Sequence, residues 1–441
     1  MAVRLDSSDK RDLRRSVTQA LMNTTDYFVA FMIAVMTGCG WAYDFNLNLT
    51  VADMWTYLQS ILIISVIIHL IFTPLESDIH VSVNGKIRLV TLFVIIITFS
   101  YYNKVNSVVF FERNILVFSW IVLWLILHDD KQIIWRRFVD VVIAIAIMSL
   151  VLYFFGSIIS VIPEYNSAKR VWGEWDPKII RNFYYFYYES HYIEIGDFIL
   201  WRNVGCFAEG PMYNFVLCTA LGAELFLRNK KAGIQTDMGR NSHIIRVTVL
   251  VITIITTIST TGFIFLAVVG AICLIKKSER CNAFRFLRSH MRLFVLLIAI
   301  ILTGIVLLKL ISPNGRGSMN VRIDHLFACI EAFRRKPIVG CGWSNIAYIY
   351  RFANYKQGIS VGLLSFMAYG GVLLSSVLFI PIIKSIKKEK KDSDYIIFEL
   401  LFLLLFFFTI VNAYPILWFF IAYITVSGSE RADEKSFNEL G

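Results

Sequence analysis

The stretch NVRIDHLFACIEAFRRKPIVGCGWSN (Asn320–Asn345) lies between two long apolar spans and governs how the chain is organised. Apolar residues recur in its first half every three or four positions, which predicts an amphipathic helix that ends before Pro337. The following Gly340-Cys341-Gly342 predicts a turn whose backbone N–H groups approach an anion closely. Two interpretations stay open here: a helix lying on the membrane surface, or part of a site for an anionic ligand.

Composition identifies the chain as an integral membrane protein. Hydrophobic residues make up 57% of its 441 residues and charged residues 17%, whereas about a quarter of a soluble domain is charged. The net charge of +11 follows membrane topology and does not indicate nucleic acid as a partner. The seven cysteines predict packed free thiols, with one bridge among Cys206, Cys329 and Cys341 as the alternative. We expect no cleavable signal peptide, because the N-terminus is long and charged.

Apolar segments predict an all-α polytopic membrane protein with about 12 transmembrane helices, because a bilayer core of about 30 Å requires roughly 20 apolar residues per helix. Two pairs of segments are joined by short turns, one at Ser259–Gly262 and one at Asn412–Pro415. The segments are centred on Tyr27–Ala42, Trp55–Phe72, Leu89–Tyr102, Ile115–Leu127, Phe138–Ile162, Met212–Leu227, Val247–Ile258, Thr261–Ile275, Leu293–Leu310, Val361–Ile382, Tyr395–Ile410 and Ile416–Val426.

Lysine and arginine predict the orientation of the chain in the membrane. With the N-terminus inside, the inner segments hold twice as many of these residues as the outer ones, which places both termini in the cytoplasm. We expect a cytoplasmic N-terminus (1–22), a single membrane domain (23–426) and a cytoplasmic tail (427–441). Two long outer loops, 163–211 and 311–360, keep most of the outer basic residues. An anionic ligand explains this retention, and so does the plain solubility of large translocated loops.

The first outer loop is rich in aromatic residues and ends in a charged motif. Tyr187, Tyr188, His191 and Trp201 are candidates for stacking on sugar rings, although an aromatic belt at the membrane interface gives the same pattern. The motif WRNVGCFAEGP then runs directly into an apolar span and puts Arg202 and Glu209 at the membrane edge. These two side chains either pair with each other, or Glu209 is a carboxylate positioned to accept a proton.

The order of these motifs resembles that of the O-antigen polymerase and O-antigen ligase superfamily. The resemblance covers about residues 200–380 and implies a GT-C-like fold that transfers a glycan from undecaprenyl pyrophosphate to an acceptor sugar. One departure is Gly210, which stands between the motif's glutamate and Pro211. The matching features are Trp201–Pro211 with Arg202 and Glu209, the Ser259–Gly262 turn, Arg322 with Gly340 and Gly342 in the second loop, and Ala368–Gly371 in the next span.

The resemblance favours the polymerase branch of this superfamily. The ligase branch usually carries a histidine shortly before the span that follows the second loop, and the corresponding Gln357–Val361 has none. The chain is therefore expected to be a Wzy-type polymerase in the bacterial inner membrane that joins lipid-linked repeat units into O-antigen or capsular polysaccharide. An O-antigen ligase and a transporter of lipid-linked glycans or sugars are the alternatives.

The implied chemistry assigns roles to individual side chains. Arginines would stabilise the departing pyrophosphate, since guanidinium groups bind phosphate oxygens bidentately. A base would take the proton of the acceptor hydroxyl, and no motif indicates a metal or nucleotide, so we expect neither. Expected partners are undecaprenyl-pyrophosphate-linked oligosaccharides and membrane lipid, with a chain-length regulator and a flippase as further candidates. The candidate arginines are Arg202, Arg322, Arg335 and Arg334, with Arg316 and Arg351 in reserve; the candidate bases are Glu209, then His325, then Asp324 and His191.

Overall fold

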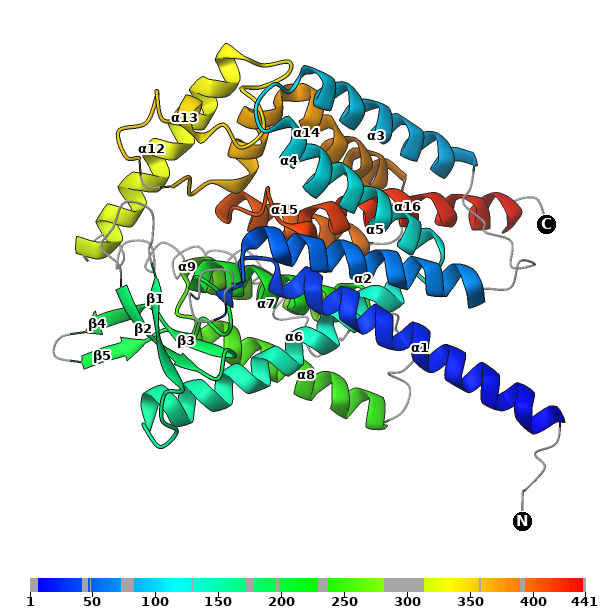
Figure 1. Cartoon of the computed structure of the whole chain (residues 1–441), viewed down its shortest axis with the longest axis horizontal. Helices are drawn as coiled ribbons and strands as arrows, with labels where there is room; N and C mark the ends of the chain where they lie inside the picture. Colours follow the sequence, from blue (N-terminus) through cyan, green and yellow to red (C-terminus); the bar gives the residue numbers. More distant parts are fainter. Residues whose placement is uncertain are drawn as a thin grey trace.

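The computed structural model shows a bundle of helices with both chain termini at one end and a small β-structure at the other (Figure 1). The predicted outer loops 163–211 and 311–360 lie together at the end opposite the termini (Figure 1). The structure describes residues 7–41, 47, 49–72, 83–128, 130–170, 178–195, 198–228, 237–280, 313–356, 358–388 and 393–438.

Helices make up most of the described residues, and they occupy the predicted apolar segments that fall within them. The predicted segment Leu293–Leu310 lies outside the described residues. In chain order the helices are α1 (Ser7–Val35), α2 (Val51–Phe72), α3 (Val83–Tyr102), α4 (Ser107–Phe110), the π-helix η3 (Phe111–Leu116), α5 (Val117–Ile126), α6 (Gln132–Leu152), the π-helix η4 (Tyr153–Ile158), α7 (Gly210–Phe226), α8 (Asp237–Thr256), α9 (Thr260–Arg280), α12 (Pro313–Arg335), α13 (Ile346–Ile349), α14 (Gly362–Lys388), α15 (Ser393–Phe408) and α16 (Pro415–Asn438).

Four helical stretches among the described residues are long and apolar enough to cross a membrane. They are Val51–Phe72, Ser107–Ile126, Gln132–Ile158 and Gly362–Lys387. Shorter apolar helices accompany them at Asn241–Thr256, Thr260–Lys276 and Pro415–Ser427. These helices agree with a helical membrane protein, since each buries its own backbone hydrogen bonds.

The first predicted span, Tyr27–Ala42, is placed too far along the chain. Helix α1 already begins at Ser7 and ends at Val35. Gly38 then takes a left-handed φ of 89°, and Cys39 forms an isolated antiparallel bridge with Phe207. A Cβ at Gly38 would lie 2.8 Å from the side chain of Met212, so this turn packs directly against the start of α7.

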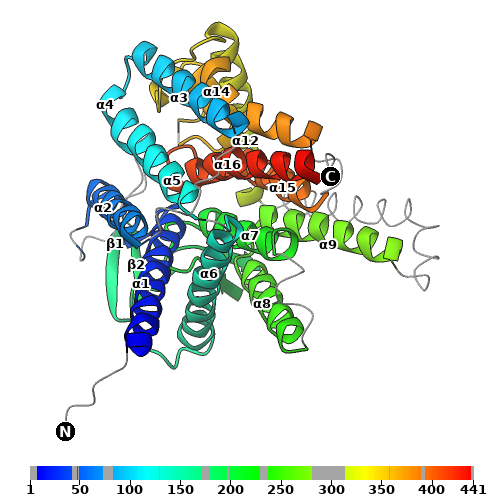
Figure 2. The ribbon, with the colours of Figure 1, turned by 90° about the vertical axis from the view of Figure 1, so that its right-hand side faces the viewer.

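Two helices form the centre of the bundle. Nearly every side chain of α7 is buried, and α7 packs against α6, α8 and α15. The apolar half of α16 is equally buried and packs against α3, α5 and α14 (Figure 2). A helix that is apolar on all sides requires neighbours all round, and this accounts for the central place of both.

Helix α14 is broken near its start, and a loop segment completes the break. Gly371 has φ 59° and ψ −161°, so the helix cannot continue through it. A Cβ at Gly371 would lie 2.4 Å from the Ile338 carbonyl oxygen, and one at Gly340 would lie 2.3 Å from the Tyr369 carbonyl oxygen. Glycine is therefore required both in the loop, at Gly340, and at the break in α14, at Gly371. Their backbone bonds are Cys341 N–H to Ala368 O (2.9 Å), Gly342 N–H to Tyr369 O (3.1 Å), Val372 N–H to Pro337 O (2.7 Å) and Leu373 N–H to Ile338 O (3.0 Å).

The first outer loop folds into two small antiparallel sheets, which the sequence analysis did not predict. The strands are β1 (Asn166–Arg170), β2 (Lys178–Phe183), β3 (Tyr187–Glu189), β4 (Tyr192–Ile195) and β5 (Phe198–Trp201). One sheet has the order β1-β2-β3, and the other pairs β4 with β5. The second hairpin ends at Trp201 and so delivers the chain directly to Arg202.

Candidate functional site

Arg202 is held by the turn between α8 and α9. Its side-chain Nε–H donates to the Thr257 carbonyl oxygen at 2.9 Å, and its backbone N–H donates to the His191 carbonyl oxygen at 2.9 Å. The next residue, Asn203, donates its backbone N–H to the Thr256 carbonyl oxygen at 3.0 Å. The helical hairpin noted in the sequence thus supports the arginine, and backbone carbonyls fix its direction without neutralising its charge.

Gly210, the departure from the motif that this stretch resembles, makes room for the Arg202 side chain. A Cβ at Gly210 would lie 2.9 Å from the Arg202 Nη2 atom, so the missing side chain makes room for the guanidinium group. Glu209 precedes it at the N-cap position of α7 in extended conformation (φ −142°, ψ 149°). The Glu209 side chain does not cap α7, and it takes part in other interactions. The turn therefore brings the Glu209 carboxylate within electrostatic reach of the Arg202 guanidinium at the start of a buried helix.

Arg322 of α12 completes this group from the second outer loop. Burial lowers the pKa of Arg202, the Glu209 carboxylate opposes this, and the charge of Arg322 lowers the pKa further. Burial likewise lowers the pKa of Arg322, again opposed by Glu209. Arginine keeps its charge at neutral pH, so the three side chains carry a net charge of +1. A partly buried cluster with excess positive charge suits an anionic group.

His325 and Asp324 bind the loop that follows α13 instead of pointing to this cluster. The His325 ring is fully buried, with Nδ1 3.0 Å from Ser360 Oγ and Nε2 2.9 Å from the Tyr355 carbonyl oxygen. The Asp324 carboxylate accepts hydrogen bonds from the backbone N–H groups of Asn354 (2.8 Å) and Tyr355 (2.9 Å). Both side chains are engaged in fastening the loop, and this geometry does not suit their assigned role as bases.

Arg334 and Arg335 lie far from Arg322 on the same helix. At a rise of about 1.5 Å per residue they are roughly 18–20 Å away along the axis. Both side chains are exposed and pair with Glu331, at 3.3 Å for Arg334 and 2.9 Å for Arg335. They therefore do not share one pyrophosphate with Arg322, and the prediction that groups these four arginines is wrong for this pair.

The Gly340 and Gly342 turn is also not an anion cradle. The N–H of Gly340 donates to the Lys336 carbonyl oxygen (3.1 Å), and the N–H of Gly342 donates to the Tyr369 carbonyl oxygen (3.1 Å). The first bond goes back to the residue after α12 and the second goes to the break in α14, so both N–H groups already have acceptors within the chain. The glycines are required for left-handed φ values of 76° and 104° and for close backbone contact, which is a packing role.

The predicted sugar-binding aromatics divide between the interior and the surface. Tyr187 and Tyr188 are buried, and the Tyr187 hydroxyl lies 2.9 Å from Ser157 Oγ, so neither ring can stack on a sugar. His191 is half-buried with Nδ1 2.9 Å from Ser190 Oγ. Trp201 is half-buried and lies edge-on against the exposed Tyr192 at 5.1 Å. The exposed aromatic residues of this loop that the sequence analysis did not single out include Tyr165, Tyr184 and Tyr192.

The sequence analysis also missed the supporting residues Asn203, Thr256 and Thr257, which carry no charge and give no motif. A histidine within an apolar span indicates a candidate functional site. His69 in α2 is such a residue, and it was not singled out from the sequence. The described cysteines are free thiols, as expected.

Searches against protein-family models, curated proteins and solved structures find no match to this chain.

Proposed function

We propose that the chain is a membrane glycosyltransferase that polymerises undecaprenyl-pyrophosphate-linked oligosaccharide repeat units on the outer face of the bacterial inner membrane. Its product would be O-antigen or a related surface polysaccharide. In this proposal all of the predicted apolar segments cross the membrane, about 12 in number, in a GT-C-like arrangement.

The observation that carries the proposal is the meeting of Arg202, Arg322 and Glu209. They come from two loops separated by more than a hundred residues, and the charges of Glu209 and Arg322 both act on Arg202. The strands of the first loop and helix α12 of the second lie at the end of the bundle opposite both termini (Figure 1). Retaining two guanidinium groups in partial burial costs solvation free energy, which an anionic ligand would offset. A lipid pyrophosphate brings such an anion to the membrane edge.

The proposed step is a displacement at the anomeric carbon of the growing chain. Glu209 accepts the proton of the acceptor hydroxyl while that oxygen bonds to the anomeric carbon. The bond from the anomeric carbon to the pyrophosphate oxygen breaks, and undecaprenyl pyrophosphate leaves with the electron pair. Arg202 and Arg322 stabilise the charge that develops on the leaving oxygen. The ester bond between the sugar and the pyrophosphate, already present in the donor, supplies the free energy.

The test uses purified protein in detergent and a synthetic lipid-pyrophosphate repeat unit, without nucleotide sugar. We expect products that differ by one repeat unit. Arg322→Ala should lower the rate about a hundredfold or more, since removing one donor to a developing negative charge costs that much. Arg334→Ala is the matched control, because it removes an exposed arginine of the same helix, and its rate should equal that of the wild type.

Three outcomes would contradict the proposal. A single transfer to a lipid A-type acceptor, with no series of products, would identify a ligase. Transport of the labelled donor across proteoliposomes without any new glycosidic bond would identify a transporter. Equal losses in Arg322→Ala and Arg334→Ala would show that general charge, and not the Arg202–Glu209–Arg322 cluster, supports the reaction.

A further inference from the structure

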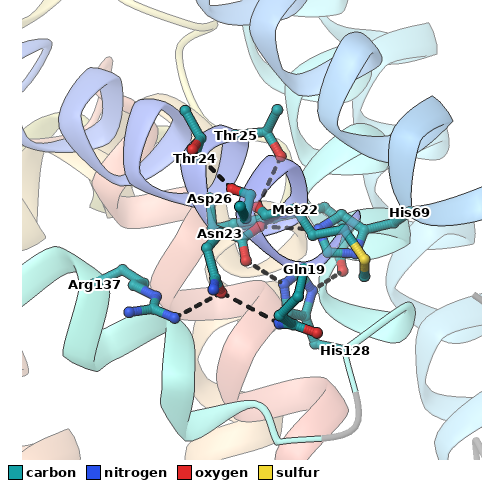
Figure 3. A network of polar contacts seen from close by, with 11 residues as sticks. Gln19, Met22, Asn23, Thr24, Thr25, Asp26, His69, His128 and Arg137 are labelled. Carbon is teal, nitrogen blue, oxygen red and sulfur yellow. Dashed lines mark hydrogen bonds and ion pairs between the residues drawn. The ribbon is translucent and has the colours of Figure 1, made fainter. Parts of the chain in front are cut away.

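A second group of ionisable side chains is buried among α1, α2 and the end of α5. Asp26, His69 and His128 are 3%, 2% and 8% exposed. His69 Nε2 lies 3.0 Å from Asp26 Oδ1, and His128 Nε2 lies 3.1 Å from Asp26 Oδ2. The three donor atoms all lie within 4.8 Å of one another. Figure 3 shows the carboxylate between the two imidazole rings.

The hydrogen bonds of His128 require a cation in this group. Its Nδ1 lies 2.8 Å from the Trp124 carbonyl oxygen, which can only accept, so Nδ1 carries a proton. Its Nε2 faces a carboxylate oxygen, which also accepts when ionised. A neutral imidazole has only one N–H. Either a second proton or a metal ion must therefore lie between Nε2 and Asp26.

Two buried polar atoms on α2 lack a partner among the described residues. They are Nδ1 of His69 and Oγ of Ser65, one helical turn earlier on the same face. Buried polar atoms are nearly always paired, and exceptions call for a specific cause. Contacts within the chain thus do not account fully for this cluster, although they account for Asp26.

We propose that Asp26, His69 and His128 bind a divalent transition-metal ion of the Zn²⁺ type. Two imidazoles and one carboxylate are the donor set of three-ligand zinc sites and suit first-row divalent metals generally. For two of the three ligands, His128 and Asp26, the surroundings are those that orient metal ligands. Trp124 O accepts from His128 Nδ1–H and leaves Nε2 facing inward, and Trp124 Nε1–H donates to Asp26 Oδ1 at 3.0 Å.

One ligand comes from α1 and one from α2, and His128 lies just after the end of α5. The ion would join these three segments to one another. None of its ligands is among the residues proposed for glycan transfer. The sequence analysis expected no metal, because the ligands are spread over positions 26, 69 and 128 and form no spaced motif.

The test is metal binding by the full-length protein, purified with a tag free of histidine and stripped with a chelator. Titration with Co²⁺ should give one ion per chain and the visible absorption of Co²⁺ bound to nitrogen and oxygen ligands, and Zn²⁺ should displace it. His69→Gln and His128→Gln should each weaken binding by at least about tenfold. His243→Gln is the control, because it alters another histidine–carboxylate pair, His243–Glu224, and should bind as the wild type.

A measurement on the unaltered protein keeps the test independent of variant folding. Cu²⁺ bound to the wild type should show couplings to two imidazole nitrogens in pulsed electron paramagnetic resonance. Absence of Co²⁺ and Zn²⁺ binding by the wild type, or couplings to fewer than two imidazoles, would overturn the proposal. The cation beside His128 would then be a second proton.

Discussion

Gly340→Ala should destabilise the outer end of α14 far more than the same change at Gly358. Both glycines have left-handed φ values, 76° and 81°, so alanine costs about 1–2 kcal/mol of backbone strain at either position. Only at Gly340 would the new Cβ meet backbone, at 2.3 Å from the Tyr369 carbonyl oxygen, whereas nothing lies within 4 Å at Gly358. Relieving that overlap breaks the hydrogen bonds of Cys341 and Gly342 to α14, each contributing about 1 kcal/mol.

The difference between the two variants is therefore about 2–3 kcal/mol, which corresponds to a factor of roughly 30–140 in the population of the opened segment. Cys341 lies inside the segment, and its thiol is buried and free, so its rate of reaction with a maleimide dye reports opening. Cys341 should react that much faster in the Gly340→Ala variant than in the Gly358→Ala variant. Equal labelling rates would refute the reasoning, because they would mean that the close backbone approach contributes nothing.

Further predictions concern single groups. Gly210→Ala should displace the Arg202 guanidinium and slow glycan transfer about tenfold in the synthetic-substrate assay, whereas Gly270→Ala, with nothing within 4 Å, should not. Burial raises the pKa of Asp324, but its hydrogen bonds lower it below the ordinary 3.8 overall, so its hold on the loop should be present above that pH and disappear as the pH falls through the lowered value. Amide exchange of that loop, corrected for its intrinsic pH dependence, should show this in the wild type and not in Asp324→Asn. Tyr187→Phe removes the hydrogen bond to Ser157 and should cost about 1 kcal/mol of stability, measured by thermal unfolding. It should leave glycan transfer unchanged; a slower transfer would indicate that the hydroxyl contacts the substrate.

The helical part of the fold was predictable because it depends on local pattern. The apolar repeat before Pro337 predicted α12, which ends at Arg335. The bulk of the apolar segments became helices for the same reason. The strands of the first outer loop were not predictable in this way, since β3 buries all of its residues and shows no alternation.

The candidate site was predictable only in part. Arg202 and Glu209 were singled out because charge at the edge of an apolar span is expensive and therefore conspicuous, and Arg322 was singled out through the family resemblance. Tyr187 was misjudged because an aromatic residue looks the same in a sequence whether it faces solvent or a core. Gly340 and Gly342 were misjudged because Tyr369, which Gly340 approaches closely and to which Gly342 donates, is distant in sequence. A glycine-rich turn does not reveal whether its N–H groups face a ligand or another chain segment.

The shared hydrogen bonds between the loop and the break in α14 constrain how the protein is assembled. In hydrocarbon each unpaired backbone group costs several kcal/mol, so the break cannot form in lipid by itself. Residues 337–342 are synthesised before α14, and they supply its missing partners. Assembly of this helix thus requires that residues 337–342 dock against its break. An insertion between positions 337 and 342 should disturb the assembly of α14, although it changes no residue of that helix.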